Sequence, residues 1–147
     1  PNNPRTLTRL ANVAIRRGRL DEALRCCEQA LRADPLSAIV HAVYGNVCYY
    51  LGRLDEAEAR RRKVLELSPG WLSGHFYLGK VLLARNDAAA ALAEMRLEQS
   101  PFWRLTGLVL AHQQRRRALP ALWSLPGPLQ FGAAPEGAGG TDPLRRP

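Results

Sequence analysis

The sequence has few cysteines, and their spacing carries no recognisable chemistry. Cys26, Cys27 and Cys48 are the only three among 147 residues, and no pair has C-x-x-C spacing. An odd number of cysteines at these spacings indicates neither a disulfide framework nor a zinc site. We therefore predict free thiols in a reducing compartment, a cytoplasmic location, and no metal or other cofactor.

Long apolar runs are also missing. No stretch approaches the ~18 uninterrupted apolar residues that a membrane span needs. The first residues, PNNPR, lack the basic segment followed by an apolar run that marks a secretory signal. We predict no membrane span. Because the chain does not begin with methionine, we expect a fragment or a processed product.

Lysine is scarce, although the chain is strongly basic. Lys63 and Lys80 are the only lysines, every other basic residue is arginine, and the net charge is +8 with a pI near 10.3. Such a charge favours an acidic partner. A GC-rich genome, whose codons favour arginine, is the alternative explanation, and both stay open at this point.

An internal repeat of 34 residues organises the chain. Residues 18–23 and 52–57 share the sequence GRLDEA, and residues 85–91 form a weaker third copy. Single residues recur at the same shift: Pro1, Pro35 and Pro69; Ala23, Ala57 and Ala91; His41 and His75; Gly45 and Gly79. Repetition at a fixed period of this size indicates stacked copies of one small structural unit.

Each copy of the repeat reads as two helices. Leu7, Leu10, Ala11 and Ala14 follow the i, i+3, i+4, i+7 spacing of an amphipathic helix, which Gly18 should end. A second helix should begin near residue 21 and stop at residues 34–35, because the residue before a proline disfavours the α conformation. The pattern therefore predicts an all-α fold.

The units resemble tetratricopeptide repeats. Leu10, Ala23, Ala30 and Pro35 match that family's pattern in the first unit; Gly45, Ala57 and Pro69 in the second; Leu78, Gly79 and Ala91 in the third. In the fourth, Trp103 and Gly107 keep the family's spacing. Arg61 departs from the pattern, because it occupies the usual second-helix aromatic position, and we expect its stem to lie along the surface.

The resemblance implies an α-solenoid over residues 1–114. Its units are expected at about 4–37, 38–71 and 72–99, followed by the first helix of a fourth at 100–114. The segments 91–95 and 103–108 look like the end of repeat arrays attached to bacterial signalling proteins. Pro1 falls where a preceding repeat would end, so further repeats or another domain are expected upstream.

The pattern breaks after Gln114. Residues 115–147 are basic at first and then rich in proline and glycine, and we predict that they lie outside the repeat and are mostly disordered. Their composition resembles GC-rich DNA read in a shifted frame, which is a second hypothesis about this segment.

In this family the first helix of each unit lines a concave groove. The resemblance therefore implies that a partner contacts Arg5, Thr8, Arg9, Asn12, Arg16, Asn46, Tyr49, Tyr50, Ser73, Phe76, Tyr77, Lys80 and Arg104, with Ala42, Val43 and Leu108 beside them. Asn12, Asn46 and Lys80 share one repeat position and are expected to form a polar row. Aromatic residues there offer contact area, although Tyr49 and Tyr77 fit the core equally well.

One groove chemistry of the family is predicted to be absent. Binders of chaperone tails hold a carboxylate with Lys, Asn, Asn, Lys and Arg. The corresponding positions here are Thr8, Asn12, Val43, Ser73 and Tyr77, of which only Asn12 matches. We predict no such clamp.

These features favour a module that binds a protein or peptide, and they disfavour an enzyme with a small-molecule substrate. The positive charge favours an acidic partner among these. His41 and His75 recur in register, which indicates packing, and no phosphate loop or metal-ligand spacing occurs. A regulatory or oligomerisation segment of a bacterial signalling enzyme or transcription regulator is the alternative. Nucleic-acid binding through arginine is weaker, because the run of basic residues 60–63 is expected to be a solvated convex face.

Overall fold

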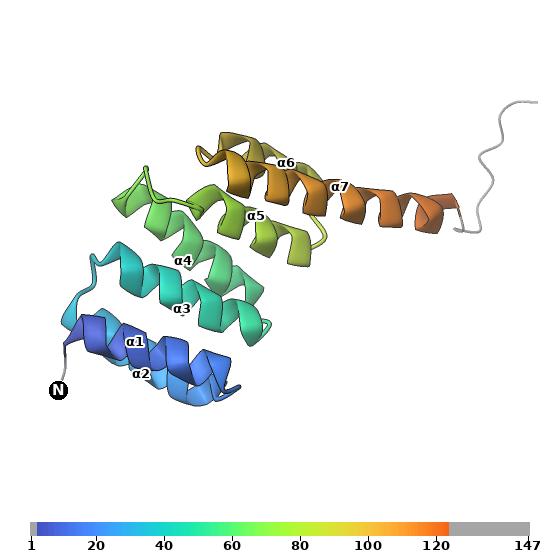
Figure 1. Ribbon diagram of the computed structural model, residues 1–147. Coiled ribbons are helices and arrows are strands. Elements are labelled where there is room, and N and C mark those ends of the chain that lie inside the picture. The colour runs from blue at the N-terminus through green and yellow to red at the C-terminus, as the bar shows by residue number, and fades with distance from the viewer. Residues whose placement is uncertain (1–2, 124–147) are drawn as a thin grey trace, which may run out of the picture.

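The described part of the chain consists of seven α-helices. The computed structural model describes residues 3–123, with side-chain surroundings to residue 117. The helices are α1 (Pro4–Arg16), α2 (Leu20–Ala33), α3 (Ala38–Tyr50), α4 (Leu54–Leu67), α5 (Gly74–Ala84), α6 (Ala88–Leu97) and α7 (Pro101–Trp123) (Figure 1). The predicted all-α class is confirmed. No helix within residues 3–123 is long and apolar enough to cross a membrane.

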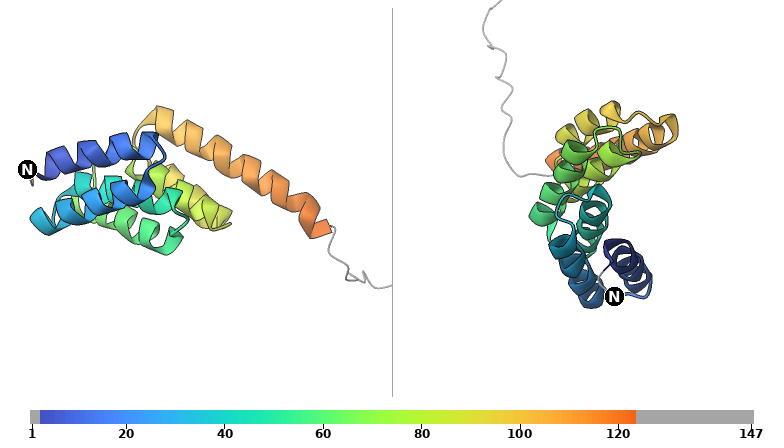
Figure 2. Two further views of the ribbon diagram at one scale, coloured as in Figure 1. Left: turned by 90° about the horizontal axis from the view of Figure 1, so that it is seen from below. Right: turned by 90° about the vertical axis from the view of Figure 1, so that its left-hand side faces the viewer.

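The helices form antiparallel pairs that stack on one another. α1 packs on α2, α3 on α4 and α5 on α6, while α7 packs on α6 and α5. α1 and α3 touch, as do α5 and α7, so the first helices of the units lie along one side of the stack (Figure 1). We call the exposed side of α1, α3, α5 and α7 the first-helix face. The predicted solenoid of three pairs plus one further helix is confirmed, and the stack is curved (Figure 2).

The turn between the two helices of each pair has the same backbone conformation. Gly18 and Gly52 have φ of +71° and +74°, and Asn86, which occupies the equivalent position in the third pair, has φ of +63°. Glycine adopts this left-handed region without steric cost, and asparagine tolerates it better than most residues. The repeated sequence therefore produces a repeated turn.

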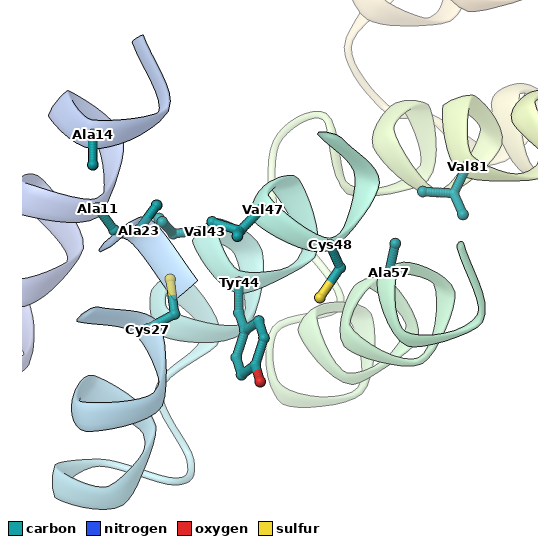
Figure 3. Close-up of a cluster of buried hydrophobic side chains, with 10 residues drawn as sticks. All are labelled: Ala11, Ala14, Ala23, Cys27, Val43, Tyr44, Val47, Cys48, Ala57 and Val81. Atoms are coloured by element: carbon teal, nitrogen blue, oxygen red, sulfur yellow. The ribbon is translucent and has the colours of Figure 1, made fainter. Parts of the chain in front are cut away.

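Small side chains let the first two pairs approach closely. Ala11, Ala23, Cys27, Val47 and Cys48 are each 0–2% exposed and belong to one cluster that spans α1 to α4 (Figure 3). All three cysteines are free, as the sequence indicated. Burial raises the pKa of the Cys27 thiol to about 12, with smaller contributions from Cys26 and Cys48, so Cys27 behaves as a small apolar residue.

Met95 fills the centre of the last three helices. A Cβ atom at Gly79 of α5 or at Gly107 of α7 would lie 2.8 Å from Met95 side-chain atoms. The two glycines thus leave room for a side chain that is fully buried. α6 is only 10 residues long, so α7 begins early and the 34-residue spacing shifts at this point.

Glu98 connects the end of α6 to the start of α5. Its carboxylate is 2% exposed and accepts backbone N–H groups from Ser73 at 3.3 Å, Phe76 at 3.2 Å and Ser100 at 3.2 Å. A helix N-terminus leaves its first N–H groups without partners and favours negative charge. The Glu98 carboxylate, at the end of α6, therefore caps the N-terminus of α5.

The last helix is longer than the sequence predicted. α7 continues through Arg115, Arg116 and Arg117 to Trp123, so the expected end near Gln114 is wrong. Glutamine, arginine and alanine are good helix formers, and no glycine interrupts them. The Gln114 side chain also donates a 2.7 Å hydrogen bond to the carbonyl of Leu83, which ties α7 to α5. The predicted disordered tail lies, from residue 124 on, outside the described residues.

Candidate functional site

The first helix presents a basic, hydrophilic edge. Arg5, Arg9, Asn12 and Arg16 are all exposed on α1, as expected of groove residues. Thr8, also predicted to contact a partner, is only 2% exposed, and its hydroxyl donates to the Arg5 carbonyl at 2.9 Å. A threonine whose hydroxyl bonds to a carbonyl of its own helix tolerates burial. The prediction that Thr8 contacts a partner is therefore wrong.

The second unit contributes fewer accessible residues than predicted. Ala42 and Val43 are 7% and 5% exposed, because α3 has α1, α2 and α4 packed against it. The expectation that Ala42 and Val43 line the groove is therefore wrong. Tyr50 is 56% exposed, and Tyr49 is half-buried with part of its ring against the core cluster.

Arg61 points into the protein. Its side chain is 3% exposed, so the expectation that it lies along the surface is wrong. The guanidinium sits 4.5 Å from the centre of the Tyr77 ring and donates a hydrogen bond from Nη2 to the Asn46 side-chain oxygen. Gly45 gives it space, since a Cβ there would lie 3.1 Å from Arg61 Nε.

The rest of the basic run 60–63 is also not one uniform face. The Arg60 guanidinium lies 4.4 Å from the centre of the buried Tyr44 ring. Arg62 is exposed and pairs with Glu58 at 2.8 Å, and Lys63 pairs with Glu66 at 2.6 Å. Of these four residues only Arg62 is exposed, as the predicted solvated face requires. The four residues span about one helical turn, so their side chains point in different directions.

Lys80 completes a small group of cations and aromatic rings. Its ammonium lies 5.1 Å from the centre of the Tyr49 ring and 5.5 Å from that of Tyr77. Burial, and then the nearby charge of Arg61, lower the Lys80 pKa below its ordinary value. Burial likewise lowers the pKa of Arg61 to about 10. Among residues 3–117, no carboxylate forms an ion pair with either cation.

Two cavities meet at these side chains. A larger pocket of about 440 Å³ lies between α3, α5 and α7 and is lined by Tyr49, Lys80, Leu83, Ala84, Asn86, Leu110, Gln113, Gln114 and Arg117. A small one of about 10 Å³, which we call the Arg61 niche, is lined by Asn46, Tyr49, Arg61, Tyr77, Lys80 and Val81. The sequence analysis did not single out the α7 residues of the larger pocket, and it ended that helix before Arg117.

The aromatic residues of the third unit face two directions. Phe76 is 5% exposed and packs 4.8 Å from Trp103 of α7, so it belongs to the core rather than to the predicted surface. Tyr77 is half-buried beside it and borders the Arg61 niche. Tyr44 and Leu78 are also buried.

The remaining predicted contacts are dispersed. Ser73 is half-buried and takes a left-handed backbone conformation at the start of α5, where its N–H meets Glu98. Arg104 is half-buried on α7. Neither residue lines a cavity of the first-helix face, so the structure brings together only Asn46, Tyr49, Tyr77 and Lys80 of the predicted set.

The histidines serve the packing of the pairs. His41 is 4% exposed, with Nε2 2.9 Å from the Pro35 carbonyl, and His75 Nδ1 lies 2.9 Å from a Glu94 carboxylate oxygen. Within the part that the structure describes, no three His, Cys, Asp or Glu side chains gather in a way that suits a metal ion.

Comparison with known proteins identifies the family. Residues 8–70 and residues 72–96 each match the tetratricopeptide repeat. The chain belongs to the tetratricopeptide repeat family. A curated relative, the protein CTR9 homolog of Arabidopsis thaliana, is 33% identical over 103 residues, which are 69% of this chain and 9% of that protein. The chain thus spans a small part of that relative.

Solved structures share the fold. The first TPR domain of human RPAP3 superposes with a TM-score of 0.71 at 18% identity, covering 82% of this chain and 98% of that one. The first TPR of Spaghetti (RPAP3), bound to the HSP90 peptide SRMEEVD, gives 0.68 at 19% identity, covering 78% and 94%. An O-GlcNAc transferase mutant of Thermobaculum terrenum gives 0.66 at 24% identity, covering 74% and 22%.

Proposed function

We propose that the chain is a protein-interaction module that binds an extended peptide segment across the first-helix face, between α3, α5 and α7. The observation that carries this proposal is the pocket of about 440 Å³, where Tyr49 and Lys80 face Gln113, Gln114 and Arg117 of α7. Aromatic rings with amide and cationic donors around them suit a peptide, whose backbone carbonyls need donors and whose side chains need apolar contact.

The comparisons support a peptide as ligand without naming it. The first TPR of Spaghetti (RPAP3), which has this fold, binds the HSP90 peptide SRMEEVD. In the present chain, Thr8 and Val43 stand at two of the five positions of the chaperone-tail clamp, and both are buried. The ligand is therefore proposed to differ from a chaperone tail.

The charge of the face supports an acidic ligand over a neutral one. Arg5, Arg9 and Arg16 on α1 and Arg115, Arg116 and Arg117 on α7 are exposed, and Arg117 lines the pocket. A positive field raises the association rate of an acidic peptide and weakens with salt. Nucleic acid is less favoured, because the aromatic rings at the pocket are half-buried rather than free for stacking.

A selection from a synthetic random heptapeptide library tests this proposal. The purified chain is compared with a Tyr49→Ala, Lys80→Ala variant and with an Arg25→Ala, Gln29→Ala control, whose changes lie at exposed positions of α2. We expect the control to retain the wild-type peptides and the pocket variant to bind them at least about tenfold more weakly. Equal retention by all three proteins, with unchanged circular dichroism, contradicts a site in this pocket.

The cytoplasmic location and the regulatory or oligomerisation role in a bacterial protein stay predictions. The match to the plant relative covers only 9% of that protein. The proposal is therefore limited to the module and leaves out any other activity of a longer protein.

A further inference from the structure

Arg61 and Lys80 are two cations that share a partly enclosed space with no described anion. Arg61 is only 3% exposed, and its Nε has no hydrogen-bond partner among the described residues. The described acidic residues with ion-pair partners lie elsewhere: Glu58 and Glu94 pair with Arg62, and Asp55 pairs with Arg85. Burying a charge without an opposite charge is unfavourable, so a retained buried cation of this kind points to an anion that is absent from the chain itself.

The neighbours of Arg61 hold its guanidinium in one orientation. The Asn46 side-chain oxygen accepts from Nη2, and the Tyr77 ring lies against the guanidinium plane at 4.5 Å. Lys80 reaches over from α5, with its ammonium between the Tyr49 and Tyr77 rings at 5.1 and 5.5 Å. A preoriented guanidinium loses little conformational freedom when it binds an anion.

The size of the niche limits the ligand. The Arg61 niche measures about 10 Å³, which is near the minimum that admits one water-sized group. Such a space admits one oxygen atom of an anionic group, and carboxylates are the anionic groups of an unmodified peptide. Tyr49 and Lys80 line both the niche and the 440 Å³ pocket, so a peptide in the pocket lies next to the niche.

We propose that Arg61 and Lys80, with Asn46 orienting Arg61, form a binding site for one carboxylate of the bound peptide. This inference rests on the proposed peptide-binding function and specifies its chemistry. The carboxylate accepts N–H groups from the two cations, and the Tyr49 and Tyr77 rings exclude water from its sides, which strengthens charge-assisted hydrogen bonds. Neither cation nor Asn46 stands at a position of the chaperone-tail clamp, and Arg61 comes from a second helix.

The test compares wild type with Arg61→Phe in the same peptide selection. The family's pattern has an aromatic residue at this position, so this variant removes the cation while suiting the fold. Arg62→Gln is the matched control, because it removes one positive charge from the exposed neighbouring position. We expect wild type and the control to enrich one acidic position in the selected peptides, and Arg61→Phe to lose that enrichment.

A double-mutant cycle then measures the coupling. The best peptide is synthesised with its acidic residue replaced by the matching amide, and each form is titrated against wild type and Arg61→Phe. We expect either change alone to weaken binding by about tenfold or more, and the two together to weaken it little further. Additive effects overturn the carboxylate site. Lys80→Met serves as the second variant if Arg61→Phe loses its helical signal.

Two forms of the library separate the possible sources of the carboxylate. Peptides made with a free C-terminus and with a C-terminal amide are selected in parallel. Loss of binding on amidation assigns the site to the chain terminus, and loss on Glu→Gln or Asp→Asn assigns it to a side chain. Peptides that bind the pocket with no acidic preference overturn this inference and leave the proposed function standing, whereas no bound peptides at all overturns the proposed function.

Discussion

The guanidinium of Arg61 on α4 lies 4.5 Å from the centre of the Tyr77 ring on α5. This contact joins the second unit to the third at a position where the family's pattern places an aromatic residue in the second helix. This chain thus has a cationic side chain, that of Arg61, at a position where the family has an aromatic ring.

Arg61→Phe is expected to raise the free energy of unfolding by about 1–3 kcal/mol. The buried guanidinium has no described carboxylate beside it, and burial lowers its pKa to about 10, because desolvation penalises the charged form. A ring at the same position contacts Tyr77 and Gly45 without that desolvation. Urea denaturation followed by circular dichroism measures the change. A decrease contradicts the view that the cation is held at a cost to stability.

Stability is expected to fall as the pH rises from 8 to 10. Burial, followed by the neighbouring charges, raises the pKa of Cys27 to about 12 and that of Cys48 to about 11, from 9.0. Above pH 9 the unfolded chain loses thiol protons that the folded chain keeps, so the folded state loses about 1 kcal/mol per thiol by pH 10. Cys27→Ala and Cys48→Ala should each flatten the pH dependence measured by urea denaturation. The titration of Arg61, which acts in the opposite direction, lies at and above the end of this range.

If both cysteine variants keep the full wild-type slope between pH 8 and 10, the thiols are not the cause of the alkaline loss. The comparison uses slopes rather than absolute stabilities, because replacing a buried thiol also leaves a small cavity.

The turn residues should respond in opposite directions to matched changes. Gly52→Ala is expected to lower stability by about 1 kcal/mol, since φ is +74° and no atom lies near enough to clash with the new methyl group. Asn86→Gly, at the equivalent turn with φ of +63°, should relieve backbone strain and change stability by less than about 0.5 kcal/mol. Thermal unfolding of both variants checks this. A large loss from Asn86→Gly would mean that its side chain contributes more than its backbone conformation.

Glu98→Ala is expected to destabilise the chain by about 2–3 kcal/mol, because three backbone N–H groups lose a charged acceptor in a buried place. Glu66→Ala is the control, since Glu66 is exposed and pairs only with Lys63 among the described ion pairs. Hydrogen exchange should show the loss locally, at Ser73 and Phe76. Unchanged protection there would refute the capping role of Glu98.

The repeat itself was readable because it depends on local rules. The segment GRLDEA at residues 18–23 and 52–57 predicts where one helix ends and the next begins. Its glycine adopts the left-handed turn, and its acidic residues suit a helix N-terminus. Ala23 and Cys27 could be placed inside by spacing, and both are fully buried. The boundary of α7 was missed, because a run of arginines reads equally as a helix surface or as a linker.

The candidate site was only partly readable. Asn46, Tyr49, Tyr77 and Lys80 were predicted from their repeat positions and meet around one niche. Thr8, Val43 and Phe76 were predicted on the same grounds and are buried, since helical spacing gives the direction of a side chain and leaves open what packs against it. Arg61 and Glu98 gave no signal of their roles.

The sequence alone determined the helices, their order and the turns between them, because capping, glycine conformation and apolar spacing act within a few residues of the chain. Only the tertiary structure decided that Arg61 turns inward to Asn46 and Tyr77, and that Glu98 returns to the start of α5. Those contacts join residues 15 to 25 positions apart in different helices. Their energies depend on burial, and burial exists only once the helices have packed.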